Sequence, residues 1–131
     1  MTVVVAYRPD RDSDDVLQRG VAEARARGSS VTLVNVARSD AVLGSGRLTE
    51  AEELDLLERL HAQGVDASVQ NVPESADVGA DIVHIADDLN AELIVIGLRH
   101  RSRVGKFILG STAQTVLLHA SCDVLSVRVG H

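Results

Sequence analysis

The chain has 131 residues, of which 45% are hydrophobic and only 2% aromatic, and its formal net charge is -6. This length suits one domain with a sizeable core, so we expect a single domain over residues 1–131, packed mainly from Val, Leu, Ile and Ala. The acidic balance argues against nucleic-acid binding. No apolar run approaches the roughly 20 residues that cross a bilayer, so no membrane partner is expected.

Cysteine usage and the first residues indicate the compartment. The single cysteine, Cys122, cannot form an internal disulfide and fits a reducing cytoplasm. Residues 1–10 contain no basic segment of a signal peptide, and their apolar run is too short for one. We therefore expect a cytoplasmic protein, with Cys122 buried as a small apolar side chain.

Short apolar runs alternate with amphipathic segments along the chain. The runs predict five strands, at Val3–Ala6, Val31–Val36, Ala67–Val72, Leu93–Ile96 and Val124–Val129. Each segment between them begins at a residue suited to a helix start, and these are Asp12 or Ser13, Thr49, Ser75, and Gly110 or Ser111. Gly28 and Gly64 are expected to end the first two helices, and Gly97 the fourth strand.

The helical segments each present one apolar face. In the second, Thr49 and Glu52 form a T-x-x-E capping box, and the face is Leu54, Leu57 and Leu60. In the last two, apolar residues recur at i, i+3, i+4 and i+7, and they are Ile82, Ile85, Ala86 and Leu89, then Ala113, Val116, Leu117 and Ala120.

This alternation predicts an α/β three-layer sandwich with a five-stranded parallel sheet. The most apolar runs, Val3–Ala6 and Leu93–Ile96, should lie side by side at its centre. Polar residues place Ala67–Val72 at one edge, and Ser126 and Arg128 place the last strand at the other. The expected strand order is therefore 3-2-1-4-5, and ligands bind at the carboxyl ends of strands where such an order reverses.

The segment 93–112 has the order strand, basic loop, helix start. Four of the 13 Lys and Arg residues fall in residues 99–106, with no acid among them. Amides at Ser111 and Thr112 would begin a helix without internal partners, so they can bind a phosphate together with the Ser111 hydroxyl. Gly97 would allow a ribose or phosphate to approach the main chain closely.

The same segment resembles the signature of the universal stress protein family, G-x2-G-x9-G-[ST], with Gly97, His100 and Gly110-Ser111 at the matching positions. The resemblance extends over nearly the whole chain. It implies an adenine-nucleotide α-hydrolase-like fold, an adenine nucleotide such as ATP as ligand, and a homodimer, often through the last strand. The implied nucleotide-binding residues are Ala6, Tyr7, Val36, Gly97, Arg99, His100, Gly110, Ser111 and Thr112.

Two residues depart from the family pattern. His100 replaces the second glycine, so its side chain could occupy ribose space. Arg8 stands where nucleotide-binding members usually have an acid, and a guanidinium cannot accept a hydrogen bond from the base. It could instead meet a phosphate or an acid. A nucleotide-free interaction protein of the same family is therefore the alternative hypothesis.

Catalysis and metal binding have little support in the sequence. Residues 100–107 differ from a Walker A loop at both ends, since His100 and Phe107 stand where glycine and Ser or Thr belong. None of the five histidines has metal-ligand spacing, and Ser111 has no evident base. We therefore expect no metal and no catalytic residue, with a weak ATPase as a third possibility.

The leading hypothesis is a cytoplasmic homodimeric ATP-binding module of the stress response, which signals through its ligand state. The last strand favours the dimer, because a bare apolar edge is a pairing hazard. The alternative is a monomeric edge blunted by Arg128 and Gly130-His131.

Overall fold

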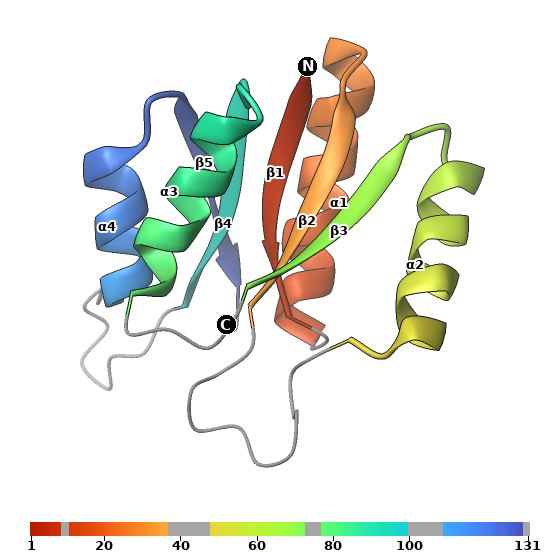
Figure 1. Cartoon of the computed structure of the whole chain (residues 1–131), viewed down its shortest axis with the longest axis horizontal. Helices are drawn as coiled ribbons and strands as arrows, with labels where there is room; N and C mark the ends of the chain where they lie inside the picture. Colours follow the sequence, from red (N-terminus) through yellow and green to blue (C-terminus); the bar gives the residue numbers. More distant parts are fainter. Residues whose placement is uncertain (9–10, 37–47, 73–76, 100–108, 130–131) are drawn as a thin grey trace.

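The computed structural model describes the chain except residues 9–10, 37–47, 73–76, 100–108 and 130–131. The described residues form five strands and four helices in strict alternation (Figure 1). The strands are β1 (Thr2–Tyr7), β2 (Ser30–Val36), β3 (Ala67–Val72), β4 (Leu93–Arg99) and β5 (Asp123–Val129). The helices are α1 (Arg11–Arg27), α2 (Glu50–Ala62), α3 (Val78–Asp88) and α4 (Ser111–His119).

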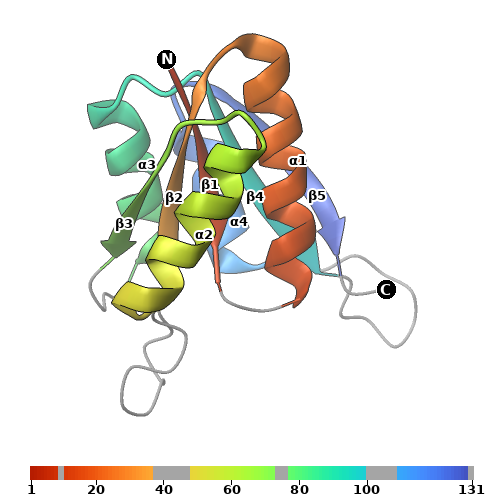
Figure 2. The ribbon, with the colours of Figure 1, turned by 90° about the vertical axis from the view of Figure 1, so that its right-hand side faces the viewer.

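All strand pairs are parallel, and the strand order is β3-β2-β1-β4-β5. This confirms the predicted order, the central place of β1 and β4, and both edge strands. Right-handed crossovers place helices on both faces of such a sheet. Figure 2 shows α1 and α2 on one face, with α3 and α4 behind the sheet.

Each face of the sheet has its own apolar core. Alternate residues of β1 point to opposite sides, so Val3 and Val5 pack with α1 and α2. Val4 packs with α3 and α4. Two glycines that the sequence analysis did not single out allow close packing in these layers. A Cβ at Gly20 would lie 2.4 Å from Val5 Cγ2, and one at Gly79 would lie 2.6 Å from Thr115 Cβ.

Several helix ends agree with the sequence pattern. The capping box is present, because Thr49 Oγ1 accepts the Glu52 N–H at 3.2 Å and Glu52 Oε1 accepts the Thr49 N–H at 3.0 Å. Gly28 and Gly64 follow α1 and α2 with φ of 66° and 82°, a left-handed conformation that favours glycine. Gly110 is the N-cap of α4, as predicted.

Other helix starts were predicted wrongly. Asp12 and Ser13 do not precede α1, because the helix already begins at Arg11 and both residues lie in its first turn. The N-cap of α3 is Asp77, whose Oδ1 accepts the Ala80 N–H at 3.0 Å, whereas Ser75 lies outside the described residues. An Asp three positions before an open amide caps as well as a Ser does, and the sequence did not separate the two.

Several apolar assignments were also wrong. On α2, Leu54 is 61% exposed and Leu57 is half-buried, whereas Leu60 is buried as predicted. The second leucine of α2 that faces the core is Leu56, one helical turn before Leu60. On α3 and α4, Ile82, Ala86, Ala113 and Val116 are buried as predicted, whereas Leu89 and Leu117 are exposed.

Gly97 does not end the fourth strand. β4 continues to Arg99 because its ladder with β5 continues, pairing Gly97 with Val127 and Arg99 with Val129. A glycine weakens a strand, yet pairing with a neighbour far along the chain overrides that local tendency here.

Candidate functional site

The carboxyl ends of the strands lie at one edge of the sheet, the lower edge in Figure 1. The strand order reverses between β1 and β4, so this pair forms the topological switch point. Their ladder covers Val3–Val5 and Leu93–Val95. Beyond it β1 runs on to Tyr7 and β4 to Arg99, and Figure 1 shows the two strands separating toward this edge.

The residues predicted to lie near the adenine are Ala6, Tyr7 and Val36. Ala6 and Tyr7 end β1, and Val36 ends β2. Ala6 is half-buried on the α3 and α4 side. Tyr7 is only 5% exposed and packs into the α1 and α2 side. The Tyr7 ring is therefore part of the core, which leaves main-chain groups as the contacts this position can offer a ligand.

Gly97 lies in β4, two residues beyond the end of the ladder with β1. A Cβ at this position would lie 2.9 Å from Val16 Cγ2 of α1 and 3.5 Å from Val129 Cγ2 of β5. Packing thus explains why residue 97 is a glycine, because α1 approaches the sheet here more closely than a larger residue would allow. This contact neither requires nor prevents a ligand at the Gly97 main chain.

The start of α4 differs from the starts of α2 and α3 at this end of the sheet. Side chains cap α2 and α3, namely Thr49 and Asp77. Gly110 has no side chain to do so, its backbone is extended at φ -69° and ψ 161°, and no described residue lies within 4 Å of where its Cβ would be. The N-cap residue therefore supplies no acceptor to the first-turn amides of α4, and the Ser111 side chain is exposed beside them.

A side chain of α4 shapes the approach to this helix start. Gln114 Nε2 donates to the Leu109 carbonyl at 2.9 Å, and the Gln114 N–H donates to the Gly110 carbonyl at 3.0 Å. Both bonds hold the two residues before the helix against its first turn. Thr112 is half-buried there, so Ser111 is the more accessible hydroxyl.

The structure describes only some of the basic residues that the sequence predicts near the site. Arg99 is the last residue of β4, while His100, Arg101, Arg103 and Lys106 lie outside the described residues. Arg8 follows β1, and its main-chain N–H donates to Ser13 Oγ at 3.0 Å. The Ser13 hydroxyl thus joins the turn after β1 to the first turn of α1, a contact that the capping assignment had missed.

A buried polar side chain at this edge escaped the sequence analysis. Asn35 is 1% exposed, its Oδ1 accepts the Leu48 N–H at 2.9 Å, and its Nδ2 donates to the Tyr7 carbonyl at 3.4 Å. The signal was present in the sequence as one carboxamide between two valines, near the end of a strand that also contains Val31 and Leu33. A carboxamide in such a run is buried at a cost unless it is hydrogen-bonded.

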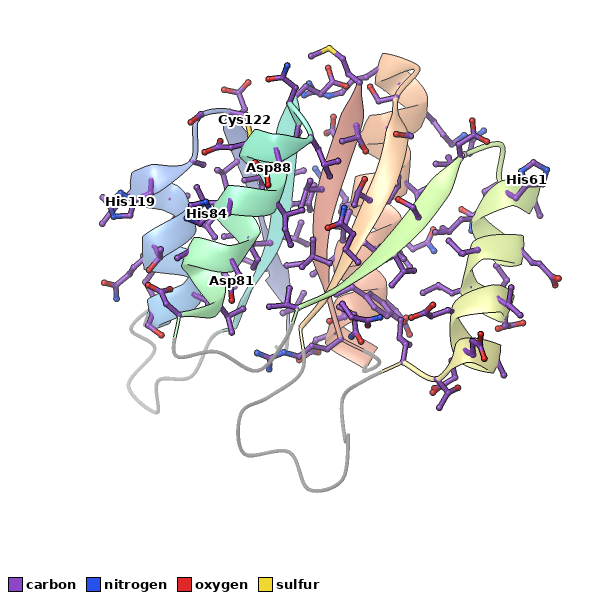
Figure 3. The ribbon with its side chains drawn as sticks, viewed as in Figure 1. His61, Asp81, His84, Asp88, His119 and Cys122 are labelled. Atoms are coloured by element: carbon purple, nitrogen blue, oxygen red, sulfur yellow. The ribbon has the colours of Figure 1, made fainter. Side chains whose placement is uncertain are left out.

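The described titratable side chains away from this end of the sheet do not form a cluster that could bind a metal ion. Among the described residues, no three His, Cys, Asp or Glu side chains could hold a metal ion together. Figure 3 shows His61 on α2, far across the molecule from His84 on α3 and His119 on α4.

An open hollow of about 390 Å³ lies at the opposite end of the strands, beside Gly28, Gly64 and Asp66, and contains none of the predicted site residues. No described helix is long and apolar enough to span a bilayer.

The geometry defines a class of protein. It is an all-parallel α/β sandwich of the adenine-nucleotide α-hydrolase-like type, in which the N-cap of α4 is a glycine that makes no side-chain cap hydrogen bond.

The chain belongs to the universal stress protein family, since the model of that family matches residues 1–128. It is 32% identical to a universal stress protein of Mycolicibacterium smegmatis over 126 residues, 96% of each chain. It is similar to the structure of a universal stress protein from Archaeoglobus fulgidus, with a TM-score of 0.74, 30% identity, and coverage of 97% and 98% of the two chains. A structure from the same organism in complex with dAMP has a TM-score of 0.67 and 26% identity, and 97% of each chain is covered.

Proposed function

We propose that this single-domain universal stress protein is a cytoplasmic, homodimeric binding module for an adenine nucleotide, ATP above all. The observation that carries the proposal is the start of α4, where Gly110 leaves first-turn amides without a side-chain cap beside the switch point. A phosphate would accept hydrogen bonds from these amides and from the Ser111 hydroxyl. The dAMP complex of the Archaeoglobus fulgidus relative supports an adenine nucleotide as the ligand class.

The remaining site residues take roles along the same edge. The ribose would lie against Gly97 and the adenine against the main chain of Ala6, Tyr7 and Val36. Arg99 would approach the phosphates, and His100 would border the ribose. The full proposed set is Ala6, Tyr7, Val36, Gly97, Arg99, His100, Gly110, Ser111 and Thr112. No metal ligand belongs to this set.

A nucleotide-free interaction protein is the second candidate. It is favoured by the contact of Val16 with Gly97, which explains that glycine by packing alone. The burial of the Tyr7 ring also prevents the one aromatic side chain among the described residues from stacking on adenine. The two candidates differ in whether the purified protein binds ATP.

Isothermal titration with ATP, on protein freed of copurified nucleotide, is the direct experiment. We expect one site per chain, and the Ser111→Ala variant should bind roughly 2- to 10-fold more weakly because one hydrogen bond to phosphate is lost. Ser121→Ala is the matched control, since Ser121 is exposed beyond the opposite end of α4. AMP and adenosine titrations should show stepwise losses if phosphates contribute.

Absence of heat at near-millimolar ATP would reject the nucleotide-binding module and leave the interaction protein. Equal affinity of Ser111→Ala, Ser121→Ala and the unmodified chain would remove the start of α4 from the site. Stoichiometric nucleotide in freshly purified protein would reject the nucleotide-free alternative.

A further inference from the structure

Asn35 occupies an unusual place for a carboxamide. It is the next-to-last residue of β2, which ends at Val36. Val31, Leu33 and Val34 of the same strand are fully buried. Its own side chain is 1% exposed. Because burying an amide without partners is costly, a polar residue at this position needs bonds that repay its desolvation.

The bonds of Asn35 connect segments that are distant along the chain. Its Oδ1 accepts the N–H of Leu48 at 2.9 Å, and its Nδ2 makes the longer bond, 3.4 Å, to the carbonyl of Tyr7. Tyr7 is also its register neighbour on β1. One side chain therefore holds the end of β1 and the point where the chain returns to α2.

A second asparagine extends the same arrangement. Asn71 is the register neighbour of Asn35 on β3, and its Nδ2 donates to Glu53 Oε1 in the first turn of α2 at 3.0 Å. Leu48, which is 8% exposed, packs in the core together with Tyr7. The entry to α2 is thus attached to the carboxyl edge through two neighbouring strands.

We propose that Asn35 is a positioning residue of the nucleotide site, which fixes the main chain of Tyr7 and of Leu48 at the end of the sheet where the adenine is proposed to bind. This inference rests on the nucleotide binding proposed above and deepens it. Asn35 does not touch the ligand in this scheme. It acts by holding the main chain at two points, Tyr7 at the end of β1 and Leu48 before α2, so that the proposed adenine contacts at the end of β1 keep their positions.

Two substitutions separate positioning from folding. Asn35→Leu keeps similar volume but removes both hydrogen bonds, and it should weaken ATP binding by about tenfold. Thr32→Val is the matched control on the same strand, because Thr32 is buried and its hydroxyl is bonded to that of Thr2 at 2.9 Å. The control should lower the unfolding temperature while leaving the ATP affinity of the folded protein unchanged.

Asn35→Asp adds a readout that a purely structural role would not produce. A protonated carboxyl can replace both bonds, because its carbonyl accepts from Leu48 and its O–H donates to Tyr7. An ionised carboxylate cannot donate and faces the Tyr7 carbonyl. Burial raises the pKa of a carboxyl, so the affinity ratio of Asn35→Asp to the unmodified protein should rise as the pH is lowered from about 8 to about 6.

The experiment is a titration of each variant with ATP, with circular dichroism confirming that each is folded at the temperature used. Weaker binding by Asn35→Leu, unchanged binding by Thr32→Val and recovery of Asn35→Asp at low pH support positioning. Equal affinity of Asn35→Leu and the unmodified chain, or a flat pH ratio for Asn35→Asp, would overturn it while leaving nucleotide binding intact. Absence of binding by the unmodified chain would instead overturn both proposals. Should Asn35→Leu fail to fold, the pH ratio of Asn35→Asp decides alone.

Discussion

At the residue scale, single polar side chains determine which main-chain groups at the carboxyl edge are already bonded. Thr49 and Asp77 each accept an amide of the helix they cap, and Asn35 accepts the amide of Leu48. Gly110 provides no such acceptor. Among the three helices whose N-caps lie in the described residues, α4 is therefore the one whose N-cap residue supplies no acceptor to the first-turn amides.

Cys122 offers a residue-scale prediction about pH. The thiol is half-buried, and burial raises its pKa, with further increases from the charges of Asp123 and Asp87. A raised pKa means that the reactive thiolate forms only at higher pH. We expect alkylation of the native protein by iodoacetamide at about pH 8 to be several-fold slower than that of the same chain unfolded in urea.

Mass spectrometry of the alkylated chain measures this rate. Asp87→Asn should speed the reaction of the native protein, because it removes a negative charge that raises the pKa of the thiol, without changing the rate in urea, where Asp87 is far from Cys122 along the chain. Identical native and unfolded rates across the alkaline range would contradict the assignment.

At the element scale, the contact of α1 with β4 depends on the missing side chain of Gly97. A methyl group there would lie 2.9 Å from Val16 Cγ2, and Val16 is 2% exposed, so it has little room to move. The helices of the other layer approach closely in the same manner, through Gly79 of α3 against Thr115 of α4. The distance between two packed elements is thus set by particular glycines, both where a helix meets a strand and where two helices meet.

Gly97→Ala is therefore expected to lower the free energy of unfolding by about 1–3 kcal/mol through overpacking. Gly110→Ala, at ordinary φ and with no described residue within 4 Å of the added Cβ, should change the same quantity by less than about 0.5 kcal/mol. Urea denaturation measures both. The double variant Gly97→Ala with Val16→Ala should lose less than the sum of the two single losses, since removal of the Val16 methyls relieves the contact.

A Gly97→Ala protein as stable as the unmodified chain would refute the overpacking. Additive losses in the double variant would show that Val16 is not the neighbour concerned.

At the scale of the whole molecule, the two edges of the sheet differ in chemistry. β3 carries Ser68, Gln70 and Asn71, and α2 lies beside it. β5 carries Val124, Leu125 and Val127, which are half-buried, and the nearby helix α4 exposes Leu118 at 76%. An apolar edge of this kind is stabilised by pairing with another strand.

We accordingly predict a symmetric homodimer through β5, to be measured by light scattering during size-exclusion chromatography. Ser126→Lys should shift the protein toward the monomer, because a symmetric strand pair brings the two added charges near each other. Ser68→Lys places the same change on the opposite edge strand and should leave the dimer intact. A monomeric unmodified protein, or equal effects of the two variants, would exclude this interface.

Local patterns of the sequence determined much of the fold. Apolar runs and glycine or capping signals act over a few residues, so the alternation of strands and helices, the capping box at Thr49 and the start of α4 at Gly110 were predictable. The relative apolarity of the strands was sufficient for the order 3-2-1-4-5, because central strands are buried on both sides. The resemblance to the universal stress protein family was based on the spacing of Gly97 and Gly110-Ser111, which is likewise a local pattern of the sequence.

Only the tertiary structure decided features that depend on partners far apart in sequence. β4 continues past Gly97 because β5 pairs with it, and α2 buries Leu56 rather than Leu54 because of how the helix lies on the sheet. The role of Asn35 was equally hidden, since Tyr7 and Leu48 approach it only when three segments meet. Sequence periodicity specifies which residues share a face, whereas their contacts depend on packing that no local pattern contains.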